Sequence, residues 1–420
     1  MAEKAPYALA FVPRLLADLT PLRESRDYRR LWTGQLVSFI GTQLTMVAVP
    51  YQVFLMTRSS LAVGLTSLAQ MVPLLVGSLA GGALADARDR RLLIIFANLA
   101  LTATSVLLAL NASLDDPSLW ALVALSAFGA GASGIYGPAR GALIPMLVRR
   151  ELLPASAALW QLLIQVGVVV GPALAGLLLA RFSLTTVYVI DAVTYGAALF
   201  AALRMAAAPP ADGGTKAGVG SVVEGLRYLR SNRVVQGTFA ADIIAMVFGM
   251  PRALFPALAL GRFAGGAGTV GLLFAAPGAG ALLAAATSGW VGRVHHQGRA
   301  VVIAIAAWGA AIAAFGVVHS LPLALLFLAV AGAADVVSAV FRNTILQDVV
   351  PDGLRGRLTA IHIFVVTGGP RMGDVEAGVV AAFAGAGASV VSGGLACVVG
   401  ILVLARALPE FSRYRNSVDA

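Results

Sequence analysis

The sequence predicts an all-α, polytopic membrane protein with twelve transmembrane helices in two pseudo-symmetric six-helix halves. Hydrophobic residues make up 59% of the 420 residues, charged residues only 12%, and the mean hydropathy is +0.87, whereas a soluble domain is about one-quarter charged. Apolar stretches of about 20 residues, the length that crosses a hydrocarbon core as a helix, recur along the chain. These two observations predict a polytopic membrane protein, and an internal repeat predicts its division into two halves.

The apolar stretches divide the chain into spans and connecting segments. Twelve spans are expected at 31–56, 60–84, 92–112, 118–139, 156–180, 185–206, 236–258, 268–291, 301–318, 321–341, 359–385 and 389–408. The chain is then expected to have an N-terminal segment at 1–30, an N-terminal half at 31–206, a linker at 207–235, a C-terminal half at 236–408 and a tail at 409–420. Within the linker, "VVEGLRYLRSNRVV" has apolar residues at helical spacing among arginines, which predicts a helix on the membrane surface.

Basic residues are distributed unevenly between the two sides of this membrane protein. When both termini are placed on one side, 25 of the 30 Lys and Arg residues fall on that side, whereas only Arg58, Arg181 and Arg262 face the other. Loops rich in Lys and Arg stay in the cytoplasm, so both termini are expected there, in the cell (inner) membrane. The net charge of +10 is interpreted as topology and contact with anionic lipid, not as a nucleic-acid surface.

Residues that would support catalysis or cofactor binding are scarce. Cys397 is the only cysteine, and the four histidines have no ligand spacing with carboxylates, so we expect no metal, no cofactor and no enzymatic activity. Gly129, Gly131 and Gly134 spell G-x-G-x-x-G, but they lie inside an apolar span with no strand before them. Close packing of helices explains these glycines better than a dinucleotide site does.

The two halves show an internal repeat at an offset of 202 residues. The shift carries Arg140, Val148, Leu152 and Ala158 onto Arg342, Val350, Leu354 and Ala360, and Gly167, Gly171 and Gly176 onto Gly369, Gly373 and Gly378. One offset therefore relates two separate segments. Two six-helix halves of the same topology, related by an axis along the membrane normal, are a transporter architecture.

Two motifs resemble those of the major facilitator superfamily, and the resemblance covers essentially the whole chain. The loop "GGALADARDRR" resembles the family's loop motif through Gly82, Leu84, Asp86, Arg90 and Arg91, with departures at Ala87 and Asp89. In the fifth span, "GVVVGPALAG" resembles the antiporter motif of exporters through Gly167, Gly171, Pro172 and Gly176, with a departure at Ala175. With "MVAVPYQVFLMTRSSLAVGL" and "RALFPALAL", the chain is similar to the enterobactin-exporter branch, which also contains drug and macrolide exporters.

The motif residues have physical roles that follow from their positions. Glycines four and five apart on one helix face let two backbones approach, so spans 5 and 11 are expected to be paired interface helices. Asp86 lies at a cytoplasmic helix end beside Arg90 and Arg91. It is expected to act as a gate latch that closes when it pairs with Arg140 or with a helix N-terminus across the half interface. The alternative is a solvated turn held by topology charges.

Five acids fall inside the predicted spans: Asp191, Asp242, Asp335, Asp374 and Glu376. A carboxylate at mid-bilayer costs about 3 kcal/mol, so each needs a partner or a proton. Asp191 is expected to make a structural hydrogen bond in a span that faces lipid or packs laterally. Asp242 and Asp335 are expected to line the central cavity, and a structural pair between Asp242 and Arg342 is the alternative.

The segment "GGPRMGDVEAG" combines three charges with the glycines of the second repeat. Arg371 and Asp374 are three residues apart and are expected to pair on one helix face. That pairing leaves Glu376 without a partner, so we expect Glu376 to exchange the coupling proton while the pair tunes it. Asp335 or Asp242 would otherwise take this role.

Polar and aromatic residues inside the spans are candidates for a substrate cavity. The candidates are Gln35, Phe39, Gln43 and Met46 of span 1, Gln165 of span 5 and Arg252 of span 7, although amides also make ordinary hydrogen bonds between helices. Exporters of this family often carry an acid in span 1 and an arginine in span 4, and neither is expected here. Coupling is therefore placed in the C-terminal half, whose predicted charges sum to −2 and suit a cation.

The sequence thus predicts a monomeric secondary exporter of amphipathic small molecules, of drug or siderophore type, driven by proton antiport and surrounded by membrane lipid. Proton-coupled uptake by symport is an alternative that the resemblance of Pro172 to the exporter motif disfavours. A non-transporting membrane scaffold or receptor is a further alternative, but it would have no need of buried carboxylates.

Overall fold

The computed structural model describes residues 18–209 and 219–415, so parts of the predicted N-terminal segment, linker and tail lie outside the described residues. The described residues form helices and connecting turns, without strands. The α-helices are α1 (Thr20–Glu24), α2 (Arg26–Thr57), α3 (Ser60–Ala87), α4 (Arg90–Ala112), α5 (Leu119–Leu147), α6 (Leu153–Arg181), α7 (Leu184–Leu203), α8 (Val219–Ser231), α9 (Arg233–Phe248), α10 (Phe255–Leu260), α11 (Ala267–Ala286), α12 (Gln297–Val317), α13 (Leu321–Val349), α14 (Asp352–Ala384), α15 (Ala386–Ala407) and α16 (Pro409–Ser412). Short 3₁₀ turns are η1 (Arg150–Leu152), η2 (Arg252–Leu254) and η3 (Ser288–Arg293).

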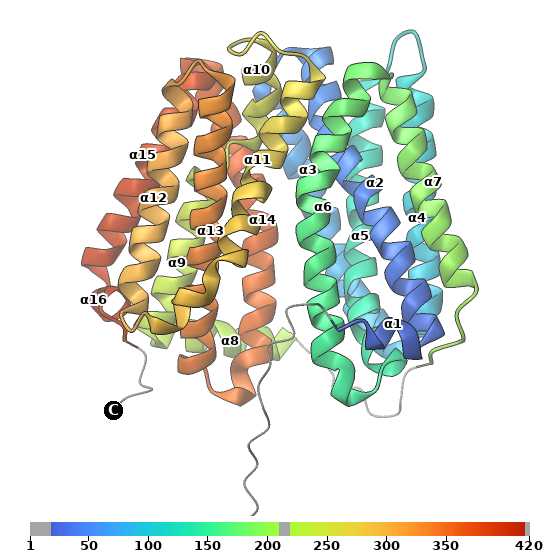
Figure 1. Ribbon diagram of the computed structural model, residues 1–420, viewed down its shortest axis with the longest axis horizontal. Coiled ribbons are helices and arrows are strands. Elements are labelled where there is room, and N and C mark those ends of the chain that lie inside the picture. The colour runs from blue at the N-terminus through green and yellow to red at the C-terminus, as the bar shows by residue number, and fades with distance from the viewer. Residues whose placement is uncertain (1–17, 210–218, 416–420) are drawn as a thin grey trace, which may run out of the picture.

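The long helices form two bundles that stand side by side (Figure 1). Helices α2–α7 make one bundle and α9–α15 make the other. The shift of 202 residues carries the bounds of α5 onto those of α13, and the start of α7 onto the start of α15. The internal repeat therefore extends from residue identities to the lengths and positions of helices.

The membrane character of these helices follows from their length and composition. Within the described residues, eleven stretches are long and apolar enough to cross a membrane, including the combined α9–α10 segment. The long helix α14 is outside this set, and it carries Arg371, Asp374 and Glu376 in its apolar part. The eleventh predicted span, 359–385, is therefore a helix in which charge replaces part of the hydrophobicity.

Short turns with polar caps connect the spans. Ser59, Ser118 and Ser183 accept hydrogen bonds from backbone N–H groups in the first turns of α3, α5 and α7. Asp89 does the same for α4, and it also accepts from the backbone N–H of Ala208. These contacts satisfy N–H groups that a helix cannot pair internally, so these four helices begin where the sequence supplies a cap.

The predicted span 236–258 is not one helix, because the chain breaks in its middle. Helix α9 ends at Phe248, and the chain resumes through η2 and α10. Gly249 follows the break and Pro251 lacks an N–H group, so the α-helical hydrogen-bond ladder cannot continue. The freed carbonyl of Gly249 accepts a hydrogen bond of 2.9 Å from Trp308 Nε1, which satisfies it inside the bundle.

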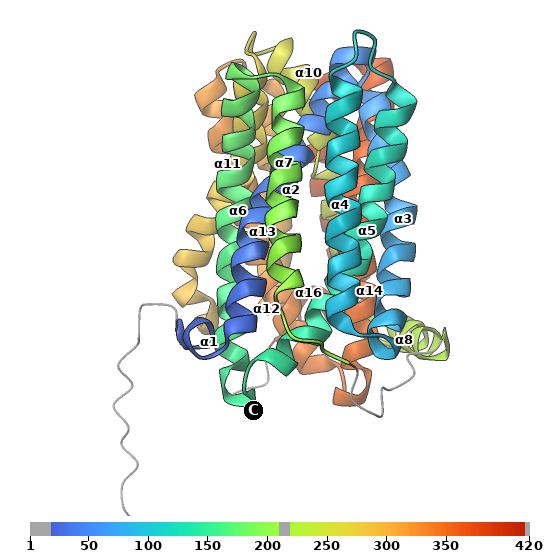
Figure 2. The same cartoon turned by 90° about the vertical axis from the view of Figure 1, so that its right-hand side faces the viewer.

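We define the lower end of the molecule as the end that carries α1, α8 and α16, and the upper end as the end that carries α10 (Figures 1 and 2). Helix α8 confirms the helix predicted in the linker. It is attached to the C-terminal bundle by an ion pair between Glu224 and Arg357 (2.6 Å) and by a hydrogen bond from Tyr228 Oη to the Val349 carbonyl (3.0 Å).

The two bundles contact each other through α3 with α14 and through α6 with α11. Spans 5 and 11 are therefore both interface helices, but the expectation that they pair with each other was wrong. Gly176 of α6 packs on Gly271 of α11, and Gly378 of α14 packs on Leu61 of α3. In a parallel duplication, the pseudo-twofold axis exchanges these two contacts, so each interface helix meets the other copy's second span.

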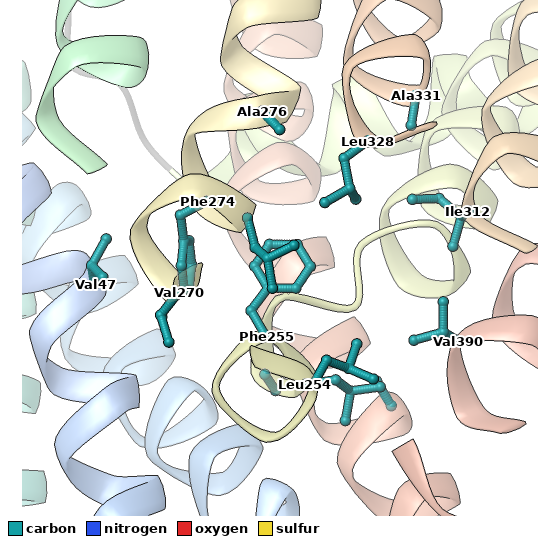
Figure 3. Close-up of a cluster of buried hydrophobic side chains, with 14 of the residues drawn as sticks. Val47, Leu254, Phe255, Val270, Phe274, Ala276, Ile312, Leu328, Ala331 and Val390 are labelled. Atoms are coloured by element: carbon teal, nitrogen blue, oxygen red, sulfur yellow. The ribbon is translucent and has the colours of Figure 1, made fainter. Parts of the chain in front are cut away.

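The largest cluster of buried hydrophobic side chains crosses the interface in the same region. Figure 3 shows Val47 of α2 beside Val270 and Phe274 of α11. Phe255 of α10 contacts Phe274 edge to face, with ring centroids 5.0 Å apart. Toward the lower end, α6 and α14 diverge (Figure 1), so the packing between the bundles is concentrated in the upper part.

The G-x-G-x-x-G glycines pack helices together, as predicted. A Cβ on Gly134 would lie 2.8 Å from the backbone N of Ser78 in α3, and one on Gly129 would lie 3.1 Å from the Thr104 side chain in α4. These positions have no room for larger side chains. The glycines therefore permit the close approach of α3 and α4 to α5.

Candidate functional site

A cavity of about 340 Å³ lies between the two bundles. Its N-terminal wall comes from α2, α3, α4, α5 and α7, and its C-terminal wall from η2, α11 and α14. Four charged residues line it: Asp191, Arg252, Arg371 and Asp374. The charges of this lining cancel when all four groups are ionised, so the predicted excess of two negative charges does not apply to the cavity.

Asp191 of α7 lines this cavity from the N-terminal side. Its Oδ2 accepts hydrogen bonds from Thr45 of α2 (2.6 Å) and Ser105 of α4 (2.8 Å), and the residue is 1% exposed. The predicted structural hydrogen bond is therefore present, but the expected lateral or lipid-facing position was wrong. Asp191 Oδ1 is buried and has no hydrogen-bond partner among the described residues, so one oxygen of the group stays available.

Asp374 joins the two bundles at the upper side of the cavity. Its Oδ2 accepts a hydrogen bond of 2.6 Å from Ser67 of α3, and its Oδ1 accepts one of 3.0 Å from the backbone N–H of Ala253. The expected pairing of Arg371 with Asp374 was wrong, because Arg371 Nη1 donates instead to the Thr367 carbonyl (2.8 Å). Both oxygens of the Asp374 carboxylate therefore accept hydrogen bonds from other elements, Oδ2 from α3 and Oδ1 from η2.

Glu376 lies away from Asp374 although only two residues separate them. Two residues on an α-helix correspond to a rotation of about 200°, so the two side chains point to nearly opposite faces. Asp374 lines the cavity and Glu376 does not. The geometry therefore favours Asp374 over Glu376 for a role in the central cavity.

Asp242 forms a buried ion pair, which was the alternative considered for it. Its Oδ1 lies 2.9 Å from Arg342 Nη2, and the two side chains are 1% and 3% exposed. His362 Nδ1 of α14 lies 3.5 Å from Asp242 Oδ2. The group joins α9, α13 and α14, and the expectation that Asp242 lines the central cavity was wrong.

Asp335 lines a second, smaller cavity and not the central one. This cavity of about 120 Å³ lies at the break after α9, with Trp308, Phe255 and Arg252 among its lining residues. Arg252 lines both cavities. The interruption of the seventh span thus places Arg252 between the two spaces.

The candidate substrate residues separate into two sets. Met46 and Arg252 line the central cavity. Gln43 is buried against Gly171 of α6, and its Nε2 has no hydrogen-bond partner among the described residues. Gln165 of α6 is half-buried and lines neither cavity.

Gln35 and Phe39 belong to a cluster of side chains from α2, α5 and α6, which we name the Arg140 cluster. Its members are Gln35, Phe39, Tyr136, Arg140 and Trp160. Tyr136 Oη donates a hydrogen bond to Gln35 Oε1, and Phe39 contacts Trp160 with ring centroids 6.5 Å apart. Arg140 Cζ lies 3.3 Å from the centroid of the Trp160 ring.

Arg140 is inside α5 but near its lower end, so it does not contradict the expectation that the fourth span has no mid-membrane arginine. The span was expected to end at residue 139, but α5 continues to Leu147. Pro138 and Arg140 both lie within this helix. The arginine therefore lies about two helical turns inside the end of α5.

The predicted gate residues lie at the lower end without a latch between them. Asp86 is exposed at the end of α3 and forms no ion pair with Arg140, which stacks on Trp160. Arg90 Nε donates to the Ala85 carbonyl (3.1 Å), and Arg91 donates to the carbonyls of α7 residues 202 and 203. The arginines hold helix ends, and the latch stays a prediction for another conformation.

Several residues of these sites were not singled out from the sequence. Ser67 and the Ala253 N–H group hold Asp374, Thr45 and Ser105 hold Asp191, and His362 lies beside Asp242. Of these residues, only His362 could have been found from the sequence, because the 202-residue shift places it in register with Trp160. Nothing in the sequence distinguishes Ser67, Thr45 and Ser105 from the other serines and threonines in apolar helices.

Two helix bundles, a cavity between them and buried charges on its walls define a membrane transporter of the major facilitator type. Solved structures show the same fold. The nucleoside transporter NupG matches with a TM-score of 0.73 at 14% identity over 93% of this chain and 100% of that chain. A bacterial homologue of the iron transporter ferroportin in the inward-facing state matches with a TM-score of 0.69 at 14% identity, over 92% and 98% of the two chains.

The chain belongs to the transmembrane secretion effector family, whose model matches residues 16–418. It is 29% identical to the enterobactin exporter EntS of Citrobacter koseri over 401 residues, or 96% of each chain. It is also 29% identical to the enterobactin exporter EntS of Escherichia coli over 403 residues, again 96% of each chain. The protein is thus a multi-pass membrane transporter and not an enzyme.

Proposed function

We propose that the protein is a secondary active exporter of amphipathic small molecules, which works by alternating access and proton antiport. The observation that carries the proposal is the central cavity between the bundles, whose walls hold one carboxylate from each half, Asp191 and Asp374. Charged groups inside a membrane protein mark substrate and proton pathways. The family and the similarity to enterobactin exporters support export as the direction.

The proposed orientation places the lower end in the cytoplasm of the cell (inner) membrane. The lower end carries α1 and α8 (Figure 2) and most of the basic loops, and such loops remain cytoplasmic. The bundles pack in the upper part and diverge below (Figure 1), which corresponds to an inward-facing conformation. In this orientation the cavity takes substrate from the cytoplasm, and the basic surface contacts anionic lipid.

We assign proton coupling to Asp374, with Asp191 as the second candidate. Asp374 holds the upper end closed by accepting a hydrogen bond from Ser67 across the bundle interface. A hydrogen bond to an ionised carboxylate is stronger than one to a neutral group, so a proton on Asp374 changes both the cavity charge and the gate. Proton occupancy and conformation are thereby linked through one side chain.

Both siderophores and drugs are candidate substrates. The balanced charge of the cavity lining removes the objection that an excess of negative charge disfavours an anion. Similarity to enterobactin exporters supports the siderophore type. A monomer contains the complete cavity, so no second copy is required by the mechanism.

Transport in everted membrane vesicles tests the proposal. Vesicles would be energised with an inward-acid gradient, and accumulation of enterobactin and of the lipophilic cation ethidium would be followed with and without a protonophore. We expect gradient-dependent accumulation that Asp374→Asn abolishes and that the matched variant Glu376→Gln retains.

The possible outcomes separate the alternatives. Accumulation that is indifferent to the protonophore would remove the antiport mechanism. Gradient-driven movement out of the everted vesicles would instead indicate uptake by symport in the cell. Loss of transport in Glu376→Gln but not in Asp374→Asn would return the coupling role to Glu376.

A further inference from the structure

The buried triad of the C-terminal half has a counterpart in the N-terminal half. The 202-residue shift carries Ile40 onto Asp242, Arg140 onto Arg342 and Trp160 onto His362. Arg342 contacts Asp242 at 2.9 Å, and His362 lies 3.5 Å from the same carboxylate. In the N-terminal half, Arg140 stacks on Trp160 with its Cζ 3.3 Å from the ring centroid. The positions of the arginine and of the aromatic ring are therefore in contact range in the N-terminal half, as they are joined through Asp242 in the C-terminal half.

The two copies differ in charge. Asp242 neutralises Arg342, whereas Ile40 provides no charge at the corresponding position. Within residues 18–209 and 219–415, Arg140 makes no ion pair within 4.0 Å. A charged side chain inside a transmembrane helix is costly unless it is compensated, and the cost is largest at the helix centre. Arg140 is thus a half-buried cation whose counter-ion the described part of the chain does not supply.

We propose that Arg140 and Trp160 form a binding site for the anionic aromatic part of a substrate. This inference rests on the proposed transport function and adds the substrate chemistry and the place of first contact. The planar guanidinium group binds a carboxylate or a pair of vicinal oxygens through two parallel N–H···O bonds. Trp160 covers one face of the group, which leaves the N–H edges for the ligand.

The surroundings of Arg140 suit an aromatic ligand and not a small inorganic anion. Phe39 and Trp160 present two rings with centroids 6.5 Å apart, and Tyr136 stands one helical turn before Arg140. Gln35 already accepts a hydrogen bond from Tyr136 and so fixes that ring. Aromatic groups bind favourably against such rings in edge or offset contact.

The Arg140 cluster lies on the lower side of the central cavity. Ser133 of α5 lines the cavity, and Arg140 follows it by seven residues, which is about 10 Å along a helix. Helix α5 runs from the upper to the lower end (Figure 2), so Arg140 is placed between the cavity and the side where the bundles diverge. A substrate that comes from the lower end would meet the Arg140 cluster before the cavity.

A comparison of salicylate with its uncharged analogue salicylamide tests the site. Dissociation constants would be measured by equilibrium dialysis on the purified full chain in neutral detergent, without any gradient. We expect the wild type to prefer salicylate by about tenfold or more, because hydrogen bonds to charged groups exceed those to neutral ones by this order. Arg140→Gln should lose that preference, and Arg140→Lys should keep part of it.

Substitutions at Ile40 give a matched pair that leaves Arg140 in place. Ile40→Asp places a carboxylate at the position that Asp242 occupies in the other repeat, where we expect it to pair with Arg140 and remove the preference for salicylate. Ile40→Asn adds the same bulk and polarity without charge, and it should retain the preference. Both variants remain informative if Arg140→Gln fails to fold, and thermal melting verifies that each is folded.

Three results would overturn the proposal. The first is a wild type without preference for salicylate, and the second is equal binding by Ile40→Asp and Ile40→Asn. The third is loss of the preference in Arg252→Gln but not in Arg140→Gln, which would place the anion in the central cavity.

A parallel series with phosphatidylglycerol distinguishes a lipid headgroup from a soluble ligand. Unchanged salicylate affinity supports the soluble aromatic anion, whereas competitive displacement by the lipid would assign the Arg140 cluster to a headgroup and refute the proposal. Because no gradient is applied, failure here leaves proton antiport untouched, and failure of antiport leaves this binding intact.

Discussion

Replacement of Gly176 by alanine should shift the transporter away from the conformation with a closed upper end. A Cβ at Gly176 would lie 2.8 Å from the Cα of Gly271, which is closer than side chains pack against backbone, so α6 and α11 must separate. Overpacking of this kind costs about 1–3 kcal/mol. If the contact exists only in the closed state, the equilibrium between the two states shifts by about 5- to 150-fold.

Distances between spin labels at the upper end report this shift. Labels at Asp115 and His319, in exposed turns of opposite bundles, would be introduced into a Cys397→Ala background and measured by double electron–electron resonance. We expect Gly176→Ala to increase the population with a long upper distance. A second pair at Arg150 and Pro351 should show a shorter lower distance in the same population.

Gly81 provides a matched control because its contact lies within one bundle. A Cβ at Gly81 would lie 2.7 Å from the Cα of Ile135, so Gly81→Ala strains α3 against α5 to a similar degree. It should lower the melting temperature without a change in either distance distribution. Unchanged distances in Gly176→Ala, or the same change in Gly81→Ala, would refute the assignment of the α6–α11 contact as part of the upper gate.

Three further substitutions test other contacts. Ser67→Ala removes the 2.6 Å hydrogen bond to Asp374, a contact with a charged group that contributes about 1.5–3 kcal/mol. It should therefore also lengthen the upper distance. A distance distribution identical to wild type would contradict the role of this hydrogen bond in the upper gate. Asp242→Asn leaves Arg342 as an uncompensated buried charge and should destabilise the protein by about 3–5 kcal/mol. The loss should appear as a lower melting temperature. The double variant Asp242→Asn with Arg342→Met should largely restore that temperature. Asp86→Asn should shift the lower distance if Asp86 latches the lower end in another conformation, and no shift would exclude the latch.

The fold class and the arrangement in two halves could be predicted from the sequence because both depend on local or repeated features. Hydropathy is summed along the chain, and a helix needs no distant partner to satisfy its backbone. The 202-residue offset that relates Arg140 to Arg342 also relates the bounds of α5 and α13. Even the break in span 7 had a local cause in Gly249 and Pro251, although it was not predicted.

The partners of the buried charges could not be predicted in the same way. Arg371 and Asp374 have the spacing of a helical pair, yet Asp374 accepts from Ser67, which is 307 residues away in sequence. Glu376 was expected to carry the proton, but the rotation of α14 turns it away from the cavity that Asp374 lines. Sequence spacing gives the possible neighbours on one helix and says nothing of what another helix offers.

The sequence by itself determined a duplicated, twelve-span transporter with acids and arginines inside its membrane helices. Only the tertiary structure decided which charges are compensated: Arg342 by Asp242, Asp374 by Ser67 and the Ala253 N–H group, and Arg140 by no carboxylate of the described chain. The reason is physical. A charge in a low-dielectric interior is stabilised by whichever polar group lies within a few ångströms, and helix packing brings that group from elsewhere in the chain.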